Sequence, residues 1–345
     1  MRAVFCRIAA DRKAATWEGQ LAPFSRLEFA LSDGATGIAA AVASRALSRR
    51  DDLTAPSLEH GLDVFHTARE AQRVLAVCWR RAEAAWEKAE AADATVAEAK
   101  RRGIDARTRG LAGTARSEWG RARAALERAE RLEAAWRRAA GALAMFDTSG
   151  RLNDRARARA EIGAAIKELP GPEWAKVRNH LIDRRSTAYL VRLHRRLGAA
   201  EPRAEMREAM AWRWWLRHVR TAPAADERIE LLCQLARDRE LDAEERASYE
   251  RVAAVLADTH RASSAVECMN SVLRMQQSRH RRMTQPMLDL KRLYWNCRPF
   301  RSGPRKDRCP YCALGLALPT YDFWELLHAD PARLAQQLST QEDSS

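Results

Sequence analysis

Near its start the chain alternates short apolar runs with helical patterns. Residues 3–8, 26–32 and 62–66 have the composition and the alternation of β-strands. Residues 9–22 and 37–47, which lie between them, carry apolar side chains at helical spacing. Strands that alternate with helices over short connections tend to pair in parallel, so we predict a small α/β layer here.

From residue 67 to about residue 249 the pattern predicts helices and no strand. Residues 67–101 and 114–146 carry apolar side chains at helical spacing among dense Ala, Arg and Glu, and three glycines lie between them. This arrangement predicts an antiparallel helical hairpin. Trp212, Trp214 and Trp215 follow further along, and packing between helices is favoured over base stacking for three tryptophans so close together.

The last part of the chain predicts two more helices, at residues 261–277 and 285–297. A basic loop, the segment CPYCALGLALPTYDFWELL and a polar tail follow them. The predicted fold class is therefore mostly α with a small α/β part.

Charge is unevenly distributed along the 345 residues. The net charge of the chain is +14, and residues 261–308 hold twelve Lys and Arg against three acidic residues. Basic residues clustered in this way are typical of proteins that contact the phosphates of nucleic acids. An excess of basic residues spread evenly would have been weaker evidence.

Cysteine usage and hydropathy point to the cytoplasm. Seven scattered cysteines do not form a disulfide framework, and no apolar run reaches the length that spans a bilayer. Cys309 and Cys312 have the spacing of zinc ligands, but no second pair follows and Cys297 supplies a third ligand at best. We therefore expect no zinc and no membrane partner.

Asp33 and Glu267 are the candidate chemical groups, and each also has a structural interpretation. Asp33 ends a predicted strand, where it either caps the next helix or places a carboxylate at the sheet edge that binds ligands in α/β folds. Glu267 could form a capping box with Ser264 at a helix start. Alternatively, Glu267, Asn270 and Arg274 share one helix face and could bind a metal ion and a phosphate. His66 could face the same sheet edge as Asp33, although a structural role is favoured.

Two stretches together resemble a known family. SDGATGIAAAV followed by LDVFHTAREAQRV resembles the middle of the RNase H-like catalytic domain of DDE transposases. RASSAVECMNSVLRMQQSRHRRMTQPMLDLKRLYWNC, running into CPYCALGLALPTYDFWELL, resembles the C-terminal end of bacterial insertion-sequence transposases. The resemblance covers roughly residues 1–75 and 255–327, and the second stretch is the more specific.

The resemblance implies a division of the chain into four parts. Residues 1–66 would hold the third to fifth strands of a partial RNase H-like core with a parallel or mixed sheet, and residues 67–255 an α-helical insertion. Residues 256–327 would hold the last catalytic helix and the basic region, and residues 328–345 a disordered tail.

The resemblance also implies a site and its partners. Asp33 and Glu267 become the second and third carboxylates that hold Mg²⁺ or Mn²⁺, with Asn270 and His66 in support. Two such ions activate the attacking oxygen and stabilise the leaving oxygen during phosphodiester hydrolysis and strand transfer. The partner would be DNA, at transposon ends and target, with a homo-oligomer possible and a location in the bacterial cytoplasm near the nucleoid. The expected DNA contacts are Arg274, Arg279, Arg281, Arg282, Lys291, Arg292, Arg301, Arg305 and Lys306.

The sequence departs from the family at the first catalytic Asp, which should lie on the opening strand of the sheet. Asp11 falls on a predicted helix, and Asp51 and Asp52 follow the second acid, so none of them takes that place. We therefore expect an N-terminally truncated transposase that is inactive alone. Two alternatives remain: a DNA-binding transposase remnant without catalysis, and an all-helical interaction protein.

Overall fold

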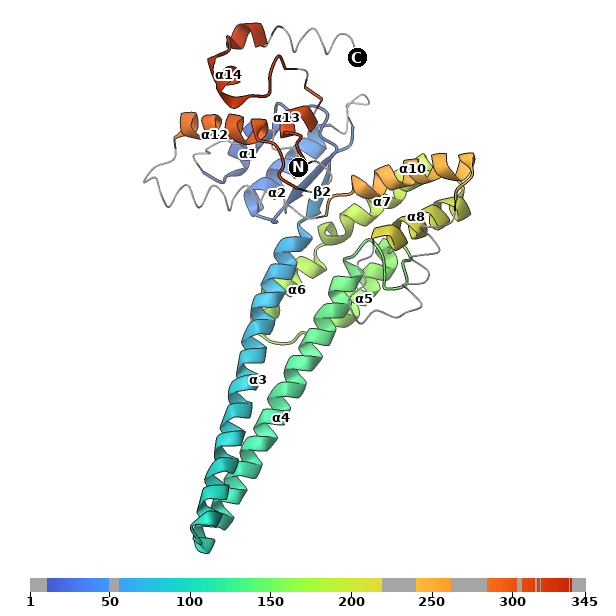
Figure 1. Cartoon of the computed structure of the whole chain (residues 1–345). Helices are drawn as coiled ribbons and strands as arrows, with labels where there is room; N and C mark the ends of the chain where they lie inside the picture. Colours follow the sequence, from blue (N-terminus) through green and yellow to red (C-terminus); the bar gives the residue numbers. More distant parts are fainter. Residues whose placement is uncertain are drawn as a thin grey trace. The chain divides into compact units, whose positions relative to one another are not determined.

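The computed structural model describes residues 11–49, 56–218, 240–261, 284–302, 306–313, 315–316, 318–334 and 336. The chain is mostly helical with one small parallel sheet, as the sequence predicts (Figure 1). It divides into two compact units, one formed by Met1–Gln20 with Ser263–Ser345 and the other by Leu21–Ala262.

The sheet of the larger unit consists of two parallel strands. β1 (Phe29–Ser32) pairs with β2 (Glu59–Leu62), and the helix α2 (Thr36–Ser48) connects them. Ala30, Val42 and Leu58 form a small buried cluster between the strands and α2. The predicted strand within residues 26–32 and the helix after it are thus confirmed, and residues 3–8 lie outside the described residues.

The predicted strand at residues 62–66 is wrong, because β2 ends at Leu62 and a helix begins at Val64. The side chain of Asp63 accepts a hydrogen bond from the amide of Phe65 at 2.7 Å and so starts that helix. Gly61 lets β2 approach β1 closely, since a Cβ there would lie 2.5 Å from the ring of Phe29. Tertiary contacts outweighed the β-propensity of the Val-Phe pair.

Two long antiparallel helices form the predicted hairpin (Figure 1). They are α3 (Val64–Arg101) and α4 (Asp105–Ala142), and the turn between them contains Gly103 at φ 68°. Alanines recur at the buried positions of both helices, which allows the helices to pack closely. The second helix begins nine residues earlier than predicted and includes Gly110 and Gly113, because packing against α3 offsets the low helix propensity of glycine.

The end of the hairpin where α3 begins and α4 ends packs against shorter helices. These are α5 (Arg155–Lys167), the 3₁₀ turn η1 (Pro172–Trp174), α6 (Ala175–Ile182), the 3₁₀ turn η2 (Arg184–Thr187) and α7 (Ala188–Ala200). Trp174, Leu181 and Leu190 are fully buried in the shared core with Leu143. The hydroxyl of Tyr189 donates a 2.6 Å hydrogen bond to the carbonyl of Leu143, which joins α7 to the end of α4.

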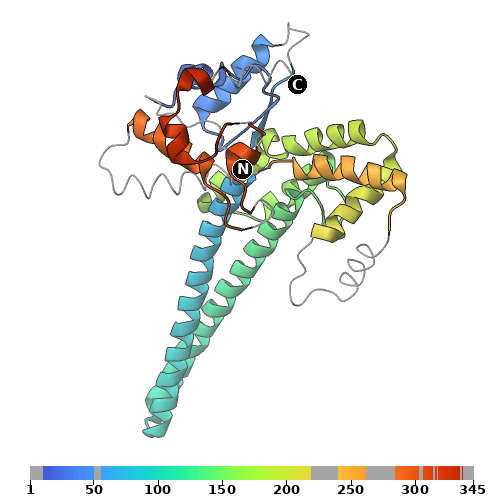
Figure 2. The same cartoon turned by 45° about the horizontal axis from the view of Figure 1, so that its top comes forward.

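A second core lies where α8 (Ala204–His218) and α10 (Ala243–Ala257) pack with α7 (Figure 2). Trp214 stacks on Phe146 with ring centroids 5.8 Å apart, and Trp215 lies against Gly150. Packing is therefore confirmed for two of the three clustered tryptophans, whereas Trp212 is 38% exposed. The described part of residues 67–249 contains no named strand.

The smaller unit contains α1 (Ala14–Leu21, apart from its last residue), α12 (Gln285–Cys297), α13 (Pro310–Ala313) and α14 (Phe323–His328). The predicted helix 285–297 is confirmed, and its N-cap Thr284 accepts a hydrogen bond from the amide of Met287. Tyr294 of α12 meets Phe323 of α14 edge to face at 5.4 Å. None of the helices in the described ranges is long and apolar enough to cross a membrane.

Candidate functional site

Two carboxylates follow the ends of the paired strands. Asp33 comes directly after β1 and Asp63 directly after β2, and the strands are in register with Ser32 opposite Leu62. The amide of Asp63 donates to the carbonyl of Ser32 at 2.8 Å, so the pairing continues to the edge of the sheet. The carboxyl ends of parallel strands are where α/β folds place their ligands.

The two carboxylates have opposite environments. Asp63 is 2% exposed and caps α3, whereas Asp33 is exposed and accepts one hydrogen bond from the amide of Ala35 at 3.1 Å. The N-cap of α2 is Ala35 and has no side-chain hydrogen bond, so the helix-cap interpretation of Asp33 is wrong. Asp33 is therefore the carboxylate of this edge that solvent reaches.

Two histidines lie close to this edge. His66 belongs to the first turn of α3 rather than to a strand, and its Nε2 lies 3.7 Å from Oδ2 of Asp63. His180 of α6 has its Nδ1 3.5 Å from the hydroxyl of Thr67. Burial lowers the pKa of His180, and Lys176 and His66 lower it further; the negative charges of Asp183 and, less strongly, Asp33 oppose them.

Sequence reasoning missed His180. It is far from Asp33 in the chain, and it lies within a helical pattern in which a histidine carries no distinguishing signal. Only the packing of α6 on α3 brings it toward the sheet edge.

A polar network supports the strand ends. His60 of β2 lies 2.8 Å from the hydroxyl of Ser32 through Nε2, and the guanidinium of Arg185 donates to its Nδ1 at 3.2 Å. Because Nδ1 accepts from Arg185, Nε2 carries the proton and donates to Ser32. Burial, followed by the positive charge of Arg185, lowers the pKa of His60 to about 4. His60 is thus neutral at physiological pH, and Asp183 holds Arg185 with a 2.6 Å ion pair.

The chain returns to the same edge just before the second predicted site residue. The carbonyl of Arg261 accepts from the amide of Val64 at 3.1 Å, and its guanidinium donates to Leu143 at 3.0 Å. Glu267, six positions later, lies outside the described residues. The same holds for Asn270, Arg274, Arg279, Arg281, Arg282 and Arg305.

Four of the expected DNA contacts are described, all in the smaller unit. Lys291 and Arg292 are half-buried on α12, and Arg292 pairs with Asp289 at 3.5 Å. Arg301 and Lys306 are exposed in the loop that follows. The two loop residues are thus open to a partner, whereas the two on α12 lie partly against the protein.

Three cysteines lie among the described residues of the smaller unit. Cys297 and Cys309 are buried, and the sulfur of Cys309 accepts from the amide of Cys312 at 3.3 Å. Burial, then the neighbouring Cys309 and Asp322, raise the pKa of Cys297 to about 11.

Within the described residues, no group of three or more His, Cys, Asp and Glu side chains could hold a metal ion. Asp33 alone therefore does not make up a divalent-metal site. A site of the predicted kind would need Glu267 beside Asp33.

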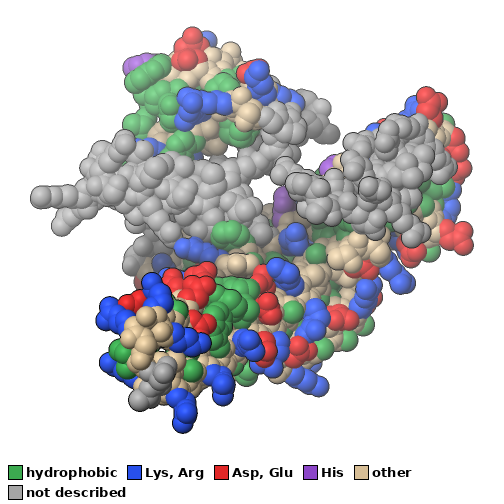
Figure 3. Space-filling model, turned by 60° about the horizontal axis from the view of Figure 1, so that its bottom comes forward, with side chains coloured by type: hydrophobic (Ala, Val, Ile, Leu, Met, Phe, Trp, Pro, Cys, Tyr) green, Lys and Arg blue, Asp and Glu red, His purple; other side chains and the backbone are tan. Residues whose placement is uncertain are grey.

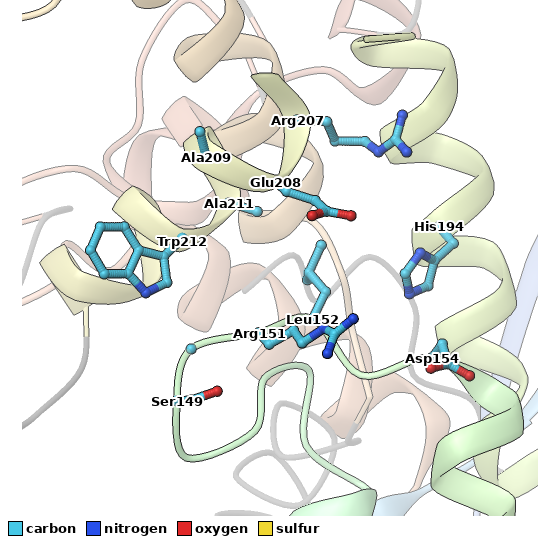
Figure 4. A pocket seen from close by; sticks show the side chains of 11 residues that line it. Ser149, Arg151, Leu152, Asp154, His194, Arg207, Glu208, Ala209, Ala211 and Trp212 are labelled. Carbon is cyan, nitrogen blue, oxygen red and sulfur yellow. The ribbon is translucent and has the colours of Figure 1, made fainter. Parts of the chain in front are cut away.

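A separate cavity of about 550 Å³ lies among the turn before α5, α7 and α8 (Figure 4). The side chains of Arg151, His194 and Glu208 point toward its centre, whereas Trp212 points away. The other arginine of its lining, Arg207, donates to carbonyl groups at the end of α7. Positive and negative groups are mixed in this cavity, so its charge selects no ligand class.

Comparison with protein-family models, with curated proteins and with solved structures found no match to this chain. The resemblance to transposases therefore depends on the motifs of the sequence alone.

Proposed function

We propose that this chain is part of a DDE-type DNA transposase, in which Asp33 and Glu267 share a divalent cation. The observation that carries the proposal is the exposed carboxylate of Asp33 at the carboxyl end of a parallel strand. The neighbouring Asp63 caps α3, whereas Asp33 is exposed and is not the N-cap of a helix. The proposal includes strands beyond β1 and β2 that would complete an RNase H-like sheet.

The path of the chain supports the pairing with Glu267. Arg261 is hydrogen-bonded beside the end of β2, and six residues reach at most about 20 Å when fully extended. Glu267 is thus within reach of Asp33 by chain length. The proposal expects no strand cleavage by this chain alone, because no residue takes the place of the first catalytic Asp.

Cleavage of the polypeptide by bound iron tests the shared cation without requiring catalysis. Fe²⁺ replaces Mg²⁺ at oxygen sites, and with ascorbate and peroxide it cuts the backbone beside its ligands. We expect cuts near residue 33 and near residue 267, both suppressed by excess Mg²⁺. Either Asp33→Asn or Glu267→Gln should abolish both cuts together.

The matched control is Asp63→Asn, which alters the neighbouring carboxylate but keeps an oxygen that can cap α3. It should leave both cuts in place. Cuts at only one position, or cuts near residue 33 that survive Glu267→Gln, would refute a shared ion.

A second candidate is DNA binding without catalysis. It is favoured by the exposed Arg301 and Lys306. It predicts salt-dependent DNA binding that needs no divalent ion and survives Glu267→Ala. The all-helical alternative is wrong as a description of the fold, because β1 and β2 form a sheet.

A further inference from the structure

The two helices of the hairpin carry opposite charges over their distal halves. Residues 105–123 of α4 contain five arginines and two acidic residues, and one of these, Glu118, pairs with Arg121. Residues 83–101 of α3 contain five acidic and three basic residues. Lys and Arg side chains project widely from the surface in Figure 3, but the surplus of basic residues lies on α4.

Three of these arginines form a stripe on α4. Arg109, Arg116 and Arg123 are spaced by seven residues, which is nearly two helical turns, so they share one face. All three are exposed, and none has an ion-pair partner among the residues that the structure describes. The stripe is about 21 Å long at 1.5 Å per residue.

Small residues lie beside the stripe. Gly113 and Gly120 are exposed within α4, and a Cβ built on either would have no neighbour within 4 Å. A glycine inside a helix costs about 0.5–1 kcal/mol relative to alanine. No packing within the protein explains that cost, whereas a partner that approaches the helix backbone closely would explain it.

We propose that this face of α4, defined by Arg109, Arg116 and Arg123, binds the phosphate backbone of double-stranded DNA. About 21 Å of duplex axis carries roughly twelve phosphate charges, so each guanidinium finds a phosphate within reach. Guanidinium groups suit phosphates because their donors are arranged in a fixed fork. The acidic α3 side repels the duplex, so DNA binds on the α4 side.

This surface goes beyond the proposed function, which concerns the cation at Asp33 and the basic C-terminal stretch. Only the choice of DNA as the polyanion depends on that function. DNA binding measured in EDTA involves no divalent ion, so the two proposals can fail independently.

The test measures binding of the full chain to a 30-base-pair duplex by fluorescence anisotropy between 50 and 300 mM salt. Each phosphate contact contributes about 0.9 to the slope of log affinity against log salt. The triple variant R109Q/R116Q/R123Q should therefore lower the magnitude of the slope by about 2.7. The charge-preserving variant R109K/R116K/R123K should retain most of it.

The matched control is R73Q/R80Q/K88Q, which removes the same charge from exposed, similarly spaced positions on α3. We expect its slope to stay within about 0.5 of the original, given the slope of about 0.9 per contact. Circular dichroism checks that all three variants keep their helices. Equal loss of slope in the α3 and α4 triples, or an unchanged slope in the α4 triple, would overturn the proposal.

Discussion

Substitution of the two carboxylates at the sheet edge should change the stability of the protein by different amounts. Asp63→Ala removes the cap of a 38-residue helix, because the Asp63 side chain accepts from the amide of Phe65 at 2.7 Å. Asp33→Ala removes one hydrogen bond to Ala35 from an exposed side chain. The pair therefore separates a structural carboxylate from one that is available for function.

The magnitudes follow from these contacts. Loss of an N-cap costs about 1 kcal/mol, and loss of a negative charge at a helix N-terminus costs about 0.3–1 kcal/mol more. Asp63 is 2% exposed, so water does not replace the lost acceptor. We expect Asp63→Ala to lower the free energy of unfolding by about 1.5–2 kcal/mol, and Asp33→Ala to change it by less than about 0.5 kcal/mol.

Urea denaturation followed by far-ultraviolet circular dichroism measures both variants, and hydrogen exchange at the Phe65 amide reports the cap directly. Asp63→Ser keeps a hydrogen-bond acceptor without the charge, so its free energy of unfolding should lie between those of wild type and Asp63→Ala. Equal destabilisation by Asp33→Ala and Asp63→Ala would refute the distinction between the two groups. Unchanged exchange at Phe65 in Asp63→Ala would refute the capping role.

Three further outcomes can be measured by the same unfolding assay. Tyr189→Phe should cost only about 0.5–1.5 kcal/mol, because the carbonyl of Leu143 keeps its hydrogen bond from Arg261; a loss above 3 kcal/mol would contradict this. The unfolded chain protonates His60 near its ordinary pKa of 6.5 and the folded chain only near about 4, so stability should fall as the pH drops between these values. His60→Gln should flatten that decline, and an unchanged pH profile would exclude His60 as its source. Gly120→Ala should raise stability by about 0.5–1 kcal/mol, since its Cβ meets open space; destabilisation would show that the glycine is needed in the free protein.

Local pattern was sufficient for the helices. The apolar spacing of residues 67–101 and 114–146 predicts the hairpin, and the pattern of residues 285–297 predicts α12 at its observed bounds. Such signals depend on residues three or four positions apart, which the helix itself brings onto one face. The same holds for Asp33, since the strand before it and the helix after it are both evident from nearby residues.

The position of β2 was decided by contacts between distant residues. His60 and Gly61 give a weak strand signal, and they form a strand because Ser32, Arg185 and the ring of Phe29 lie against them. The more β-prone residues just after them became the first turn of α3, because the buried Asp63 caps that turn. Pairing with another strand outweighs local preference at such positions.

The sequence by itself determined the helical architecture, the end of the first strand and the place of Asp33 directly after it. Only the tertiary structure decided that Asp63 is a buried cap and that His180 approaches the same edge. The physical reason is that helical periodicity is encoded among near neighbours. Burial and proximity depend instead on which distant elements pack together, and no single stretch of sequence specifies them.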